Sequence, residues 1–174
     1  MDAFWRKGFE ATSLADLTRS TGLNKASLYR VFGDKHALFM AALKNYADTE
    51  MRESRAVIDE SRSPLTNIRA VVHKVITDFA HEKGCLMINS LVELGPHDSE
   101  VANLLQSFSS TRVDALTGMI AQAQQADEVR AELDPAMLAQ SLMITLAGSA
   151  AMARGFLPRE IIVENLDILI DSWT

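Results

Sequence analysis

The stretch that decides the fold is "TGLNKASLYRVF", which covers residues 21–32. Gly22 predicts a tight turn, because glycine readily takes the left-handed conformation that ends a helix. Asn24 is a good N-cap for a second helix, on which Leu28 and Phe32 recur at helical spacing. The other positions carry Lys, Ser, Tyr and Arg, more donors than packing alone requires. The stretch therefore predicts a short helix that packs on one side and contacts a polar partner on the other.

The segment before this turn, residues 13–21, predicts another short helix. Ser13 and Asp16 have the spacing of a capping box, and Leu14 and Leu17 supply an inner face. Two short helices joined by a tight turn form the helix-turn-helix pattern, whose second helix enters the major groove of DNA. Spacing alone leaves one alternative open, an exposed helical hairpin that contacts no nucleic acid.

The candidate DNA contacts lie on the second helix and at the helix ends that flank the pair. Lys25 and Ser27 could reach base edges or phosphates. Tyr29 and Lys35 carry groups that suit phosphate oxygens. Thr12 and Ser13 lie where the N–H groups of a helix N-terminus can hold a phosphate. The candidate DNA-binding residues are Thr12, Ser13, Asn24, Lys25, Ala26, Ser27, Tyr29, Arg30 and Lys35.

The distribution of charge agrees with a DNA-binding amino-terminal part. Residues 1–45 hold seven Lys/Arg and four Asp/Glu, a sum of +3, whereas the rest of the chain holds 10 and 19, a sum of −9. A basic head on an acidic body can dock on phosphate while the body is repelled from it.

Composition predicts an all-α chain. Of the 174 residues 48% are hydrophobic and 6% aromatic, Gly and Pro are sparse, and no long run alternates apolar and polar residues. We expect a three-helix helix-turn-helix DNA-binding domain at residues 1–45 and a helical effector-binding and dimerisation domain at residues 46–174, about nine helices in all. We expect the first helix to be truncated, because no cap precedes Phe4 and Trp5.

The segment "GFEATSLADLTRSTGLNKASLYRVFGDKHALFMAAL", residues 8–43, resembles the DNA-binding region of the TetR/AcrR family of bacterial transcriptional regulators. The shared features are the Thr-Ser start, the Gly-Leu turn, Leu-Tyr-x-x-Phe and the Asp-Lys turn. The resemblance implies an all-helical homodimer whose amino-terminal helices bind double-stranded operator DNA and whose last two helices pair in a four-helix bundle. It implies contact roles for Thr12, Ser13, Lys25, Ser27, Tyr29 and Lys35.

On this basis we expect a ligand-responsive repressor that binds a palindromic operator and releases it when a small-molecule effector binds. We expect repression rather than activation only because most members of the family are repressors. We expect no cofactor and no enzymatic activity, because no Ser/His/Asp set, phosphate loop or pair of catalytic carboxylates stands out. An alternative of another class is a helical protein that binds a metal or processes a small molecule.

Residues 136–153, "AMLAQSLMITLAGSAAMA", carry no charge and are long enough to raise the question of a membrane span. Polar residues dilute the segment and it stands alone, so we predict no membrane. A helix that is apolar on every face needs cover on every face, which a partner subunit supplies. On the last helix, Ile161 and Ile168 form a second stripe that also needs cover. The candidate dimer interface is Leu146, Ala147, Ala150, Ala151, Ile162, Leu166, Leu169 and Trp173.

The candidate effector pocket combines methionines with the polar residues of a short helix predicted after residue 84. Methionine suits an adaptable apolar pocket, although it also fills cores. A few polar groups in such a pocket orient a ligand. The candidate contacts are Met87, Asn89, Ser90, Glu93, Phe108, Met119 and Met143.

Cys85 is the only cysteine, so an intrachain disulfide is excluded, and this fits a reducing cytoplasm. The residue follows Gly84 near a helix start, where the helix dipole lowers a thiol pKa. Cys85 is therefore a candidate redox or electrophile sensor, and the alternative is a small buried hydrophobe.

A metal site is the last possibility. Glu93, His97 and Asp98 lie close in sequence and could bind a metal together with His73 or His81. The Gly-Pro pair at 95–96 interrupts the helix between the first two, so we predict capping or a salt bridge there and no metal.

Overall fold

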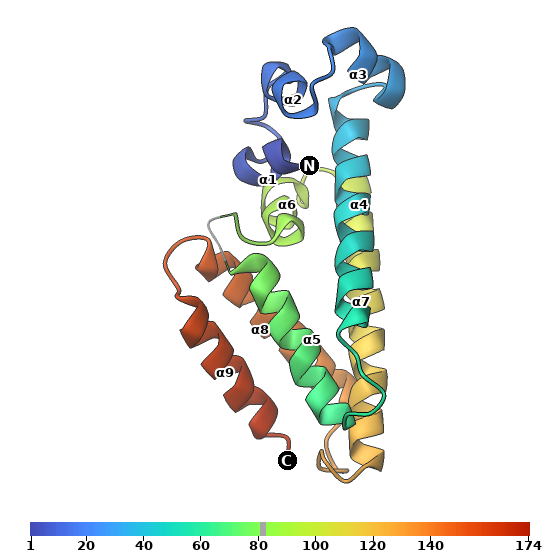
Figure 1. Ribbon diagram of the computed structural model, residues 1–174, viewed down its shortest axis with the longest axis vertical. Helices are drawn as coiled ribbons and strands as arrows, with labels where there is room; N and C mark the ends of the chain where they lie inside the picture. The colour runs from blue at the N-terminus through green and yellow to red at the C-terminus, as the bar shows by residue number, and fades with distance from the viewer. Residues whose placement is uncertain (81–82) are drawn as a thin grey trace.

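The chain folds into α-helices throughout the part that the structure describes. The structure is a computed structural model that describes residues 1–80 and 83–174, and these residues contain no strand. Its helices are α1 (Asp2–Lys7), α2 (Leu14–Thr21), α3 (Lys25–Phe32), α4 (Lys35–Ala56), α5 (Pro64–Phe79), α6 (Leu86–Leu94), α7 (Ser99–Gln125), α8 (Pro135–Ala153) and α9 (Arg159–Asp171) (Figure 1). The predicted all-α class is confirmed.

Polar caps fix where the first helices begin and end. The Ser13 side chain and the Asp16 side chain form the predicted capping box at the start of α2. Gly22 ends α2 in the left-handed conformation, with φ of 70°. Asn24 Oδ1 accepts a hydrogen bond of 2.9 Å from the Ser27 N–H, and Asp34 caps α4 in the same way. Each boundary of the predicted helix-turn-helix is therefore confirmed.

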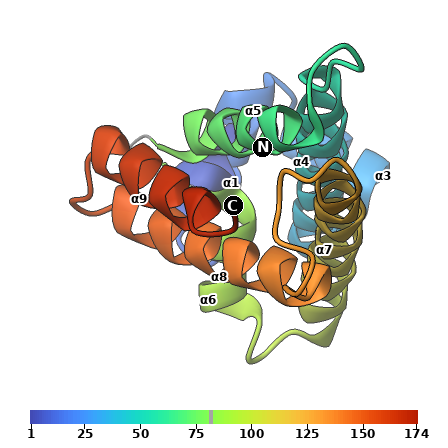
Figure 2. The ribbon, with the colours of Figure 1, turned by 90° about the horizontal axis from the view of Figure 1, so that it is seen from below.

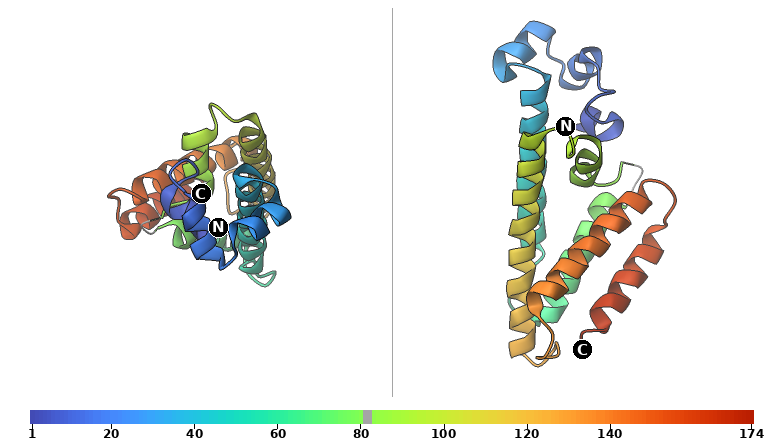
Figure 3. Two further views of the ribbon diagram at one scale, coloured as in Figure 1. Left: turned by 90° about the horizontal axis from the view of Figure 1, so that it is seen from above. Right: turned by 180° about the vertical axis from the view of Figure 1, so that it is seen from behind.

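The helices form a small head on an elongated body. Helices α1 to α3 form the head at one end, and α6 lies beneath α1 (Figure 1). Helices α4 and α7 run side by side along the long axis, and α5, α8 and α9 fill the rest of the body (Figure 3). Because α4 begins in the head and ends in the body, it connects the two directly.

The core of the head continues into the body. Phe4, Leu17 and Leu28 are each at most 3% exposed and pack in one cluster with residues of α4, α6 and α7. Leu23 is 42% exposed because it lies in the turn outside both helices. Beyond the helices of the head, the cluster includes Phe39, Leu43, Leu86, Met87, Leu94, Val101 and Leu105.

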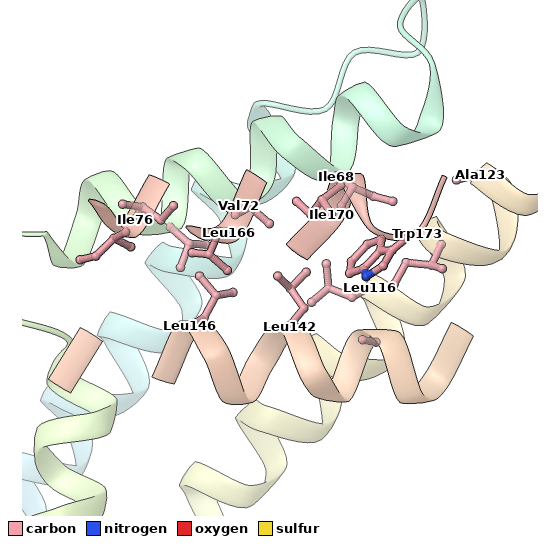
Figure 4. Close-up of a cluster of buried hydrophobic side chains, with 14 of the residues drawn as sticks. Ile68, Val72, Ile76, Leu116, Ala123, Leu142, Leu146, Leu166, Ile170 and Trp173 are labelled. Carbon is pink, nitrogen blue, oxygen red and sulfur yellow. The ribbon is translucent and has the colours of Figure 1, made fainter. Parts of the chain in front are cut away.

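A second core joins α5, α7, α8 and α9 in the body (Figure 4). It corrects part of the predicted dimer interface, because Leu146, Ala150, Ile162, Leu166 and Trp173 are 0–5% exposed here. These residues form the stripe that α8 and α9 bury within their own subunit. Apolar spacing alone does not distinguish a face buried inside a subunit from one buried between subunits.

The outer faces of α8 and α9 carry the apolar residues that remain uncovered. These two helices lie side by side at the edge of the body (Figure 2). Ile144 is 66% and Ile168 61% exposed, and Ile161 is 41% exposed. Of the helices described, only α8 is long and apolar enough to cross a membrane by length and composition, with 28% of its most apolar window buried. It packs against α5, α6, α7 and α9.

Candidate DNA-binding surface and effector cavity

Helix α3 buries one side and exposes the other. Leu28 is 2% exposed and anchors the helix in the head core. Lys25, Tyr29 and Arg30 are exposed, and the Lys25 Nζ lies 5.7 Å from the centroid of the Tyr29 ring. The sequence-predicted residues Asn24 and Ala26 are exposed beside them, and Ser27 is half-buried. This arrangement gives α3 a cationic, hydrogen-bonding outer face. The helix itself lies at one end of the molecule (Figure 3).

The predicted phosphate contacts at the starts of α2 and α4 differ in how exposed their side chains are. Thr12 is 1% exposed and its hydroxyl donates to the Gly8 carbonyl at 2.5 Å, so its side chain is absent from the outer surface. Ser13 is exposed, and its hydroxyl donates to Asp16 in the capping box. Lys35 is half-buried, with its Nζ 3.3 Å from the Glu10 carbonyl oxygen that accepts its hydrogen bond.

Glu93 joins α6 to the head, a role that its sequence position did not reveal. One carboxylate oxygen accepts from the Phe9 N–H at 2.9 Å and the other from the Glu10 N–H at 2.8 Å. Gly8 has φ of 82°, and a Cβ at this position would lie 2.6 Å from the Glu93 carboxylate. The glycine therefore gives the carboxylate access to the turn between α1 and α2.

Two further contacts tie the head to the body. The Trp5 indole N–H donates to the Gly84 carbonyl at 2.9 Å. His36, in the first turn of α4, lies 2.7 Å from Asp98, the residue that caps α7. The pKa of Asp98 is lowered, first by the N–H of Val101 that it accepts at the helix start and then by His36. The head is therefore held on the body by α6, by α7 and by α4.

A cavity of about 210 Å³ lies in the body between α4, α5, α6, α7 and α8. The predicted effector contacts Met87, Phe108 and Met143 line it, together with Cys85. Most of the remaining lining is apolar, from Val75, Phe79, Ile88, Leu91, Leu105, Ile144, Leu146, Ala147 and Ala150, with Glu50, Ser109, Arg112 and Gln140 as the polar members.

Four of the predicted pocket residues do not line this cavity. Asn89 donates to the Lys83 carbonyl at 2.8 Å, and the Ser90 hydroxyl bonds the Leu86 carbonyl of its own helix. Glu93 is the contact to the head described above. Met119 lies lower on α7, beside a separate depression. These residues lie on the same helices as the cavity lining, but their side chains contact other neighbours. Helical spacing alone does not determine which neighbour a side chain contacts.

A buried ion pair at the cavity wall was missed by sequence reasoning. Glu50 is 6% and Arg112 8% exposed, and Arg112 Nη1 donates to Glu50 Oε1 at 2.5 Å. Both residues occupy positions that continue an apolar stripe: Glu50 follows Leu43 and Tyr46 on α4, and Arg112 lies between Leu105 and Leu116 on α7. Opposite charges at core positions of two long helices were the signal that could have found the pair.

Cys85 has the opposite character to the one expected of a sensor. The Tyr46 hydroxyl lies 3.6 Å from the Cys85 sulfur. Cys85 occupies the N-cap position of α6, but its side chain accepts no capping hydrogen bond. Burial, and then the charge of Glu50, raise the thiol pKa instead of lowering it. Because the thiolate is the nucleophile, a raised pKa disfavours reaction with oxidants and electrophiles. The geometry favours the alternative, a small residue in the cavity wall.

The candidate metal ligands are dispersed. Glu93 binds backbone N–H groups, Asp98 pairs with His36, and His73 lies 3.0 Å from Asp167 on α9. His97 is exposed beyond the end of α6, and His81 lies outside the described residues. Within residues 1–80 and 83–174, no group of three His, Cys, Asp or Glu side chains could hold a metal ion.

Comparison with known proteins gives one consistent result. The family model described as "Bacterial regulatory proteins, tetR family" matches residues 1–42, and "Tetracyclin repressor-like, C-terminal domain" matches residues 63–160. The chain is 33% identical to the HTH-type transcriptional repressor ComR of Escherichia coli (strain K12) over 158 residues, which are 88% of this chain and 75% of that protein. It is 30% identical to the regulator YezE of Bacillus subtilis (strain 168) over 135 residues, 76% of this chain and 70% of that one.

Solved structures show the same fold. The regulatory protein TetR from Rhodobacter sphaeroides matches with a TM-score of 0.90 at 20% identity, over 99% of this chain and 94% of that one. A cysteine mutant of the TetR family transcriptional regulator CifR, complexed with a 26-base-pair double-strand operator DNA, matches with a TM-score of 0.85 at 25% identity. That alignment covers 99% of this chain and 92% of the other.

Proposed function

The chain belongs to the TetR family of bacterial transcriptional regulators, and from this premise we propose how it acts: as a homodimeric repressor that binds a palindromic operator and releases it when a small molecule occupies the body cavity. The family makes it a DNA-binding regulator. The homodimer, the effector, repression and a cytoplasmic location are the parts that we propose.

The observation that carries the proposal is the exposed polar face of α3. Lys25 and Arg30 form no ion pair within residues 1–80 and 83–174, so both cations are available to phosphates and base edges. Leu28 fixes the helix on the head, and the Asn24 cap orders its first turn. These are the groups that a recognition helix presents to a major groove.

The uncovered stripes of α8 and α9 support a homodimer. Met137, Ile144 and Ala151 recur every seven residues on α8, as Ile161 and Ile168 do on α9, and all five are exposed. Seven-residue spacing places apolar side chains along one side of a helix, which is the requirement for packing two helices against two others. A two-fold dimer would present two α3 helices at once, as a palindrome requires.

The cavity and the head share structural elements, which supports regulation by an effector. Helix α6 lines the cavity through Met87 and holds the head through Glu93. A ligand that prefers one position of α6 would therefore bias the position of the head. Release of DNA then reflects a difference in ligand affinity between two arrangements of the heads.

Selection of binding sites from random DNA with the full chain tests the proposal. We expect an enriched palindrome whose half-sites lie about one helical turn apart, roughly 34–36 Å. Affinity for that site should fall steeply as salt rises, because phosphate contacts release counterions. Failure to enrich any sequence, or affinity that does not change with salt, would refute the assignment of α3 as a recognition helix.

A further inference from the structure

We propose that the body cavity takes a small, uncharged molecule with an apolar body and one hydrogen-bond donor, and that Glu50 Oε2 accepts this donor. The inference deepens the proposed function, on which it rests in treating the cavity as the effector site. It is carried by one buried atom whose hydrogen bond the described residues leave unmade.

That atom is the second oxygen of the Glu50 carboxylate. Oε1 accepts from Arg112 Nη1, whereas Oε2 is fully buried and has no hydrogen-bond partner in the part of the chain that the structure describes. A buried acceptor without a donor is costly, and a hydrogen bond to a charged group is among the stronger ones. Glu50 is one of the residues that line the cavity. Oε2 itself is closed off by its neighbours, so a ligand that brings an N–H or O–H group to it must displace the cavity wall slightly, and the new hydrogen bond then removes that cost.

The charges around the cavity favour an uncharged ligand. Glu50 and Arg112 neutralise each other at the wall. Ser109 and Gln140 are uncharged, and burial raises the pKa of the Cys85 thiol, which keeps it protonated. A carboxylate ligand would face the Glu50 oxygen, and an ammonium ligand would leave a third charge in a largely apolar site. Uncompensated charge in such surroundings is expensive.

The size and lining define the rest of the molecule. A volume of about 210 Å³ is below the roughly 300–1,000 Å³ of sites for drug-sized ligands, which indicates a compact molecule. Phe79 and Phe108 offer ring surfaces, and Met87 and Met143 offer adaptable thioethers. Small alcohols, phenols and secondary amides with a hydrocarbon body have this chemistry.

A series built on one benzyl skeleton tests the proposal with the full chain. Dissociation constants are measured by calorimetry for benzyl alcohol, benzaldehyde, toluene, benzylammonium and benzoate. We expect benzyl alcohol to bind at least roughly tenfold more tightly than toluene or benzaldehyde, because only the alcohol donates to Oε2. Both ions should bind more weakly than the alcohol. Binding of either ion as tightly as the alcohol, equal binding of toluene, or no binding by any of the five would overturn the proposal.

Glu50→Gln gives the sharper result. Arg112 carries only donors, so the amide oxygen of the new side chain must face it and the NH₂ group then occupies the place of Oε2. The acceptor becomes a donor, and the preference for benzyl alcohol over benzaldehyde should fall to one or invert. Glu53→Gln makes the same chemical change at an exposed position of α4 and should keep the preference. Retention of the preference in Glu50→Gln contradicts the proposal.

Two controls keep the outcome interpretable. If Glu50→Gln unfolds because Arg112 loses its partner, the double variant E50M/R112M removes both charges and the acceptor at this wall, and it should also lose the alcohol preference. Operator binding by the ligand-free chain is measured separately. If the chain selects benzyl alcohol but binds no operator, the proposed function is refuted and the ligand class stands. If the chain binds an operator but does not select benzyl alcohol, only the ligand class is refuted.

Discussion

Truncation of Ile168 to alanine is expected to weaken the proposed dimer strongly while leaving each subunit folded. The side chain is 61% exposed in the isolated chain and lies on the face of α9 away from the body core. Its truncation therefore removes little packing within the subunit. In a two-fold dimer, the same substitution occurs twice at one interface.

The magnitude follows from the exposed fraction. Complete burial of an isoleucine side chain stabilises by about 1.5–3 kcal/mol. Taking the 61% that remains exposed, and subtracting the methyl group that alanine retains, leaves about 0.5–1.3 kcal/mol per subunit. Two subunits give about 1–2.6 kcal/mol, which raises the dimer dissociation constant roughly 5- to 80-fold.

Sedimentation equilibrium over a range of protein concentrations measures this change. Val92→Ala is the matched control, because Val92 is 74% exposed on α6 and lies outside the α8–α9 face. Circular dichroism should show the same helix content in both variants. If Ile168→Ala leaves the dissociation constant unchanged, or if Val92→Ala raises it equally, the α8–α9 face is not the dimer interface.

Three further predictions concern the head and its attachment. Lys25→Ala should weaken operator binding and make the slope of log affinity against log salt shallower by about 0.9, because one phosphate is no longer neutralised. Fluorescence anisotropy at several salt concentrations measures this slope. An unchanged slope would show that Lys25 does not contact a DNA phosphate. Glu93→Ala should lower the free energy of unfolding by about 1.5–3 kcal/mol in urea titrations, because two N–H groups of the head lose a carboxylate acceptor, and a decrease no larger than that of Val92→Ala would contradict this. The lowered pKa of Asp98 predicts stability that is fully present above its ordinary value of 3.8 and lost as pH falls through the lowered value. Asp98→Asn should therefore flatten the acid limb of the stability curve, and an unchanged limb would show that Asp98 contributes nothing to it.

The sequence predicted the local features well because their causes are local. Ser13, Asn24 and Asp34 each accept a hydrogen bond from the N–H three residues later, so the residue type and its spacing determine the helix start. The same holds for Gly22, which needs only its own backbone freedom to end α2. The helix-turn-helix, and the polar face of α3, follow from these short-range rules.

Contacts between distant segments were beyond such rules. On α9, Ile162 and Ile168 both belong to stripes with apolar residues, and the packing of α5 and α8 places the Ile162 stripe inside the subunit. Glu93 meets backbone N–H groups 83 and 84 residues away, and the predicted phosphate contact Thr12 is buried by the turn that Glu93 holds. Sequence spacing gives no information about partners at that separation.

If the cavity binds the proposed ligand, the Glu50–Arg112 pair is the contact through which we expect the ligand to act on the DNA-binding helices. Glu50 and Phe39 lie on the same helix, α4, about 16 Å apart at 1.5 Å per residue. Phe39 is 1% exposed in the core that the head shares with α6 and α7, so the amino-terminal half of α4 is packed directly against the head. A ligand donor at Oε2 would share the carboxylate that ties α4 to α7, and we expect it to change the contact between the two long helices without touching the head. For this reason Glu50→Gln should alter not only which ligand binds but also how far a bound ligand changes operator affinity.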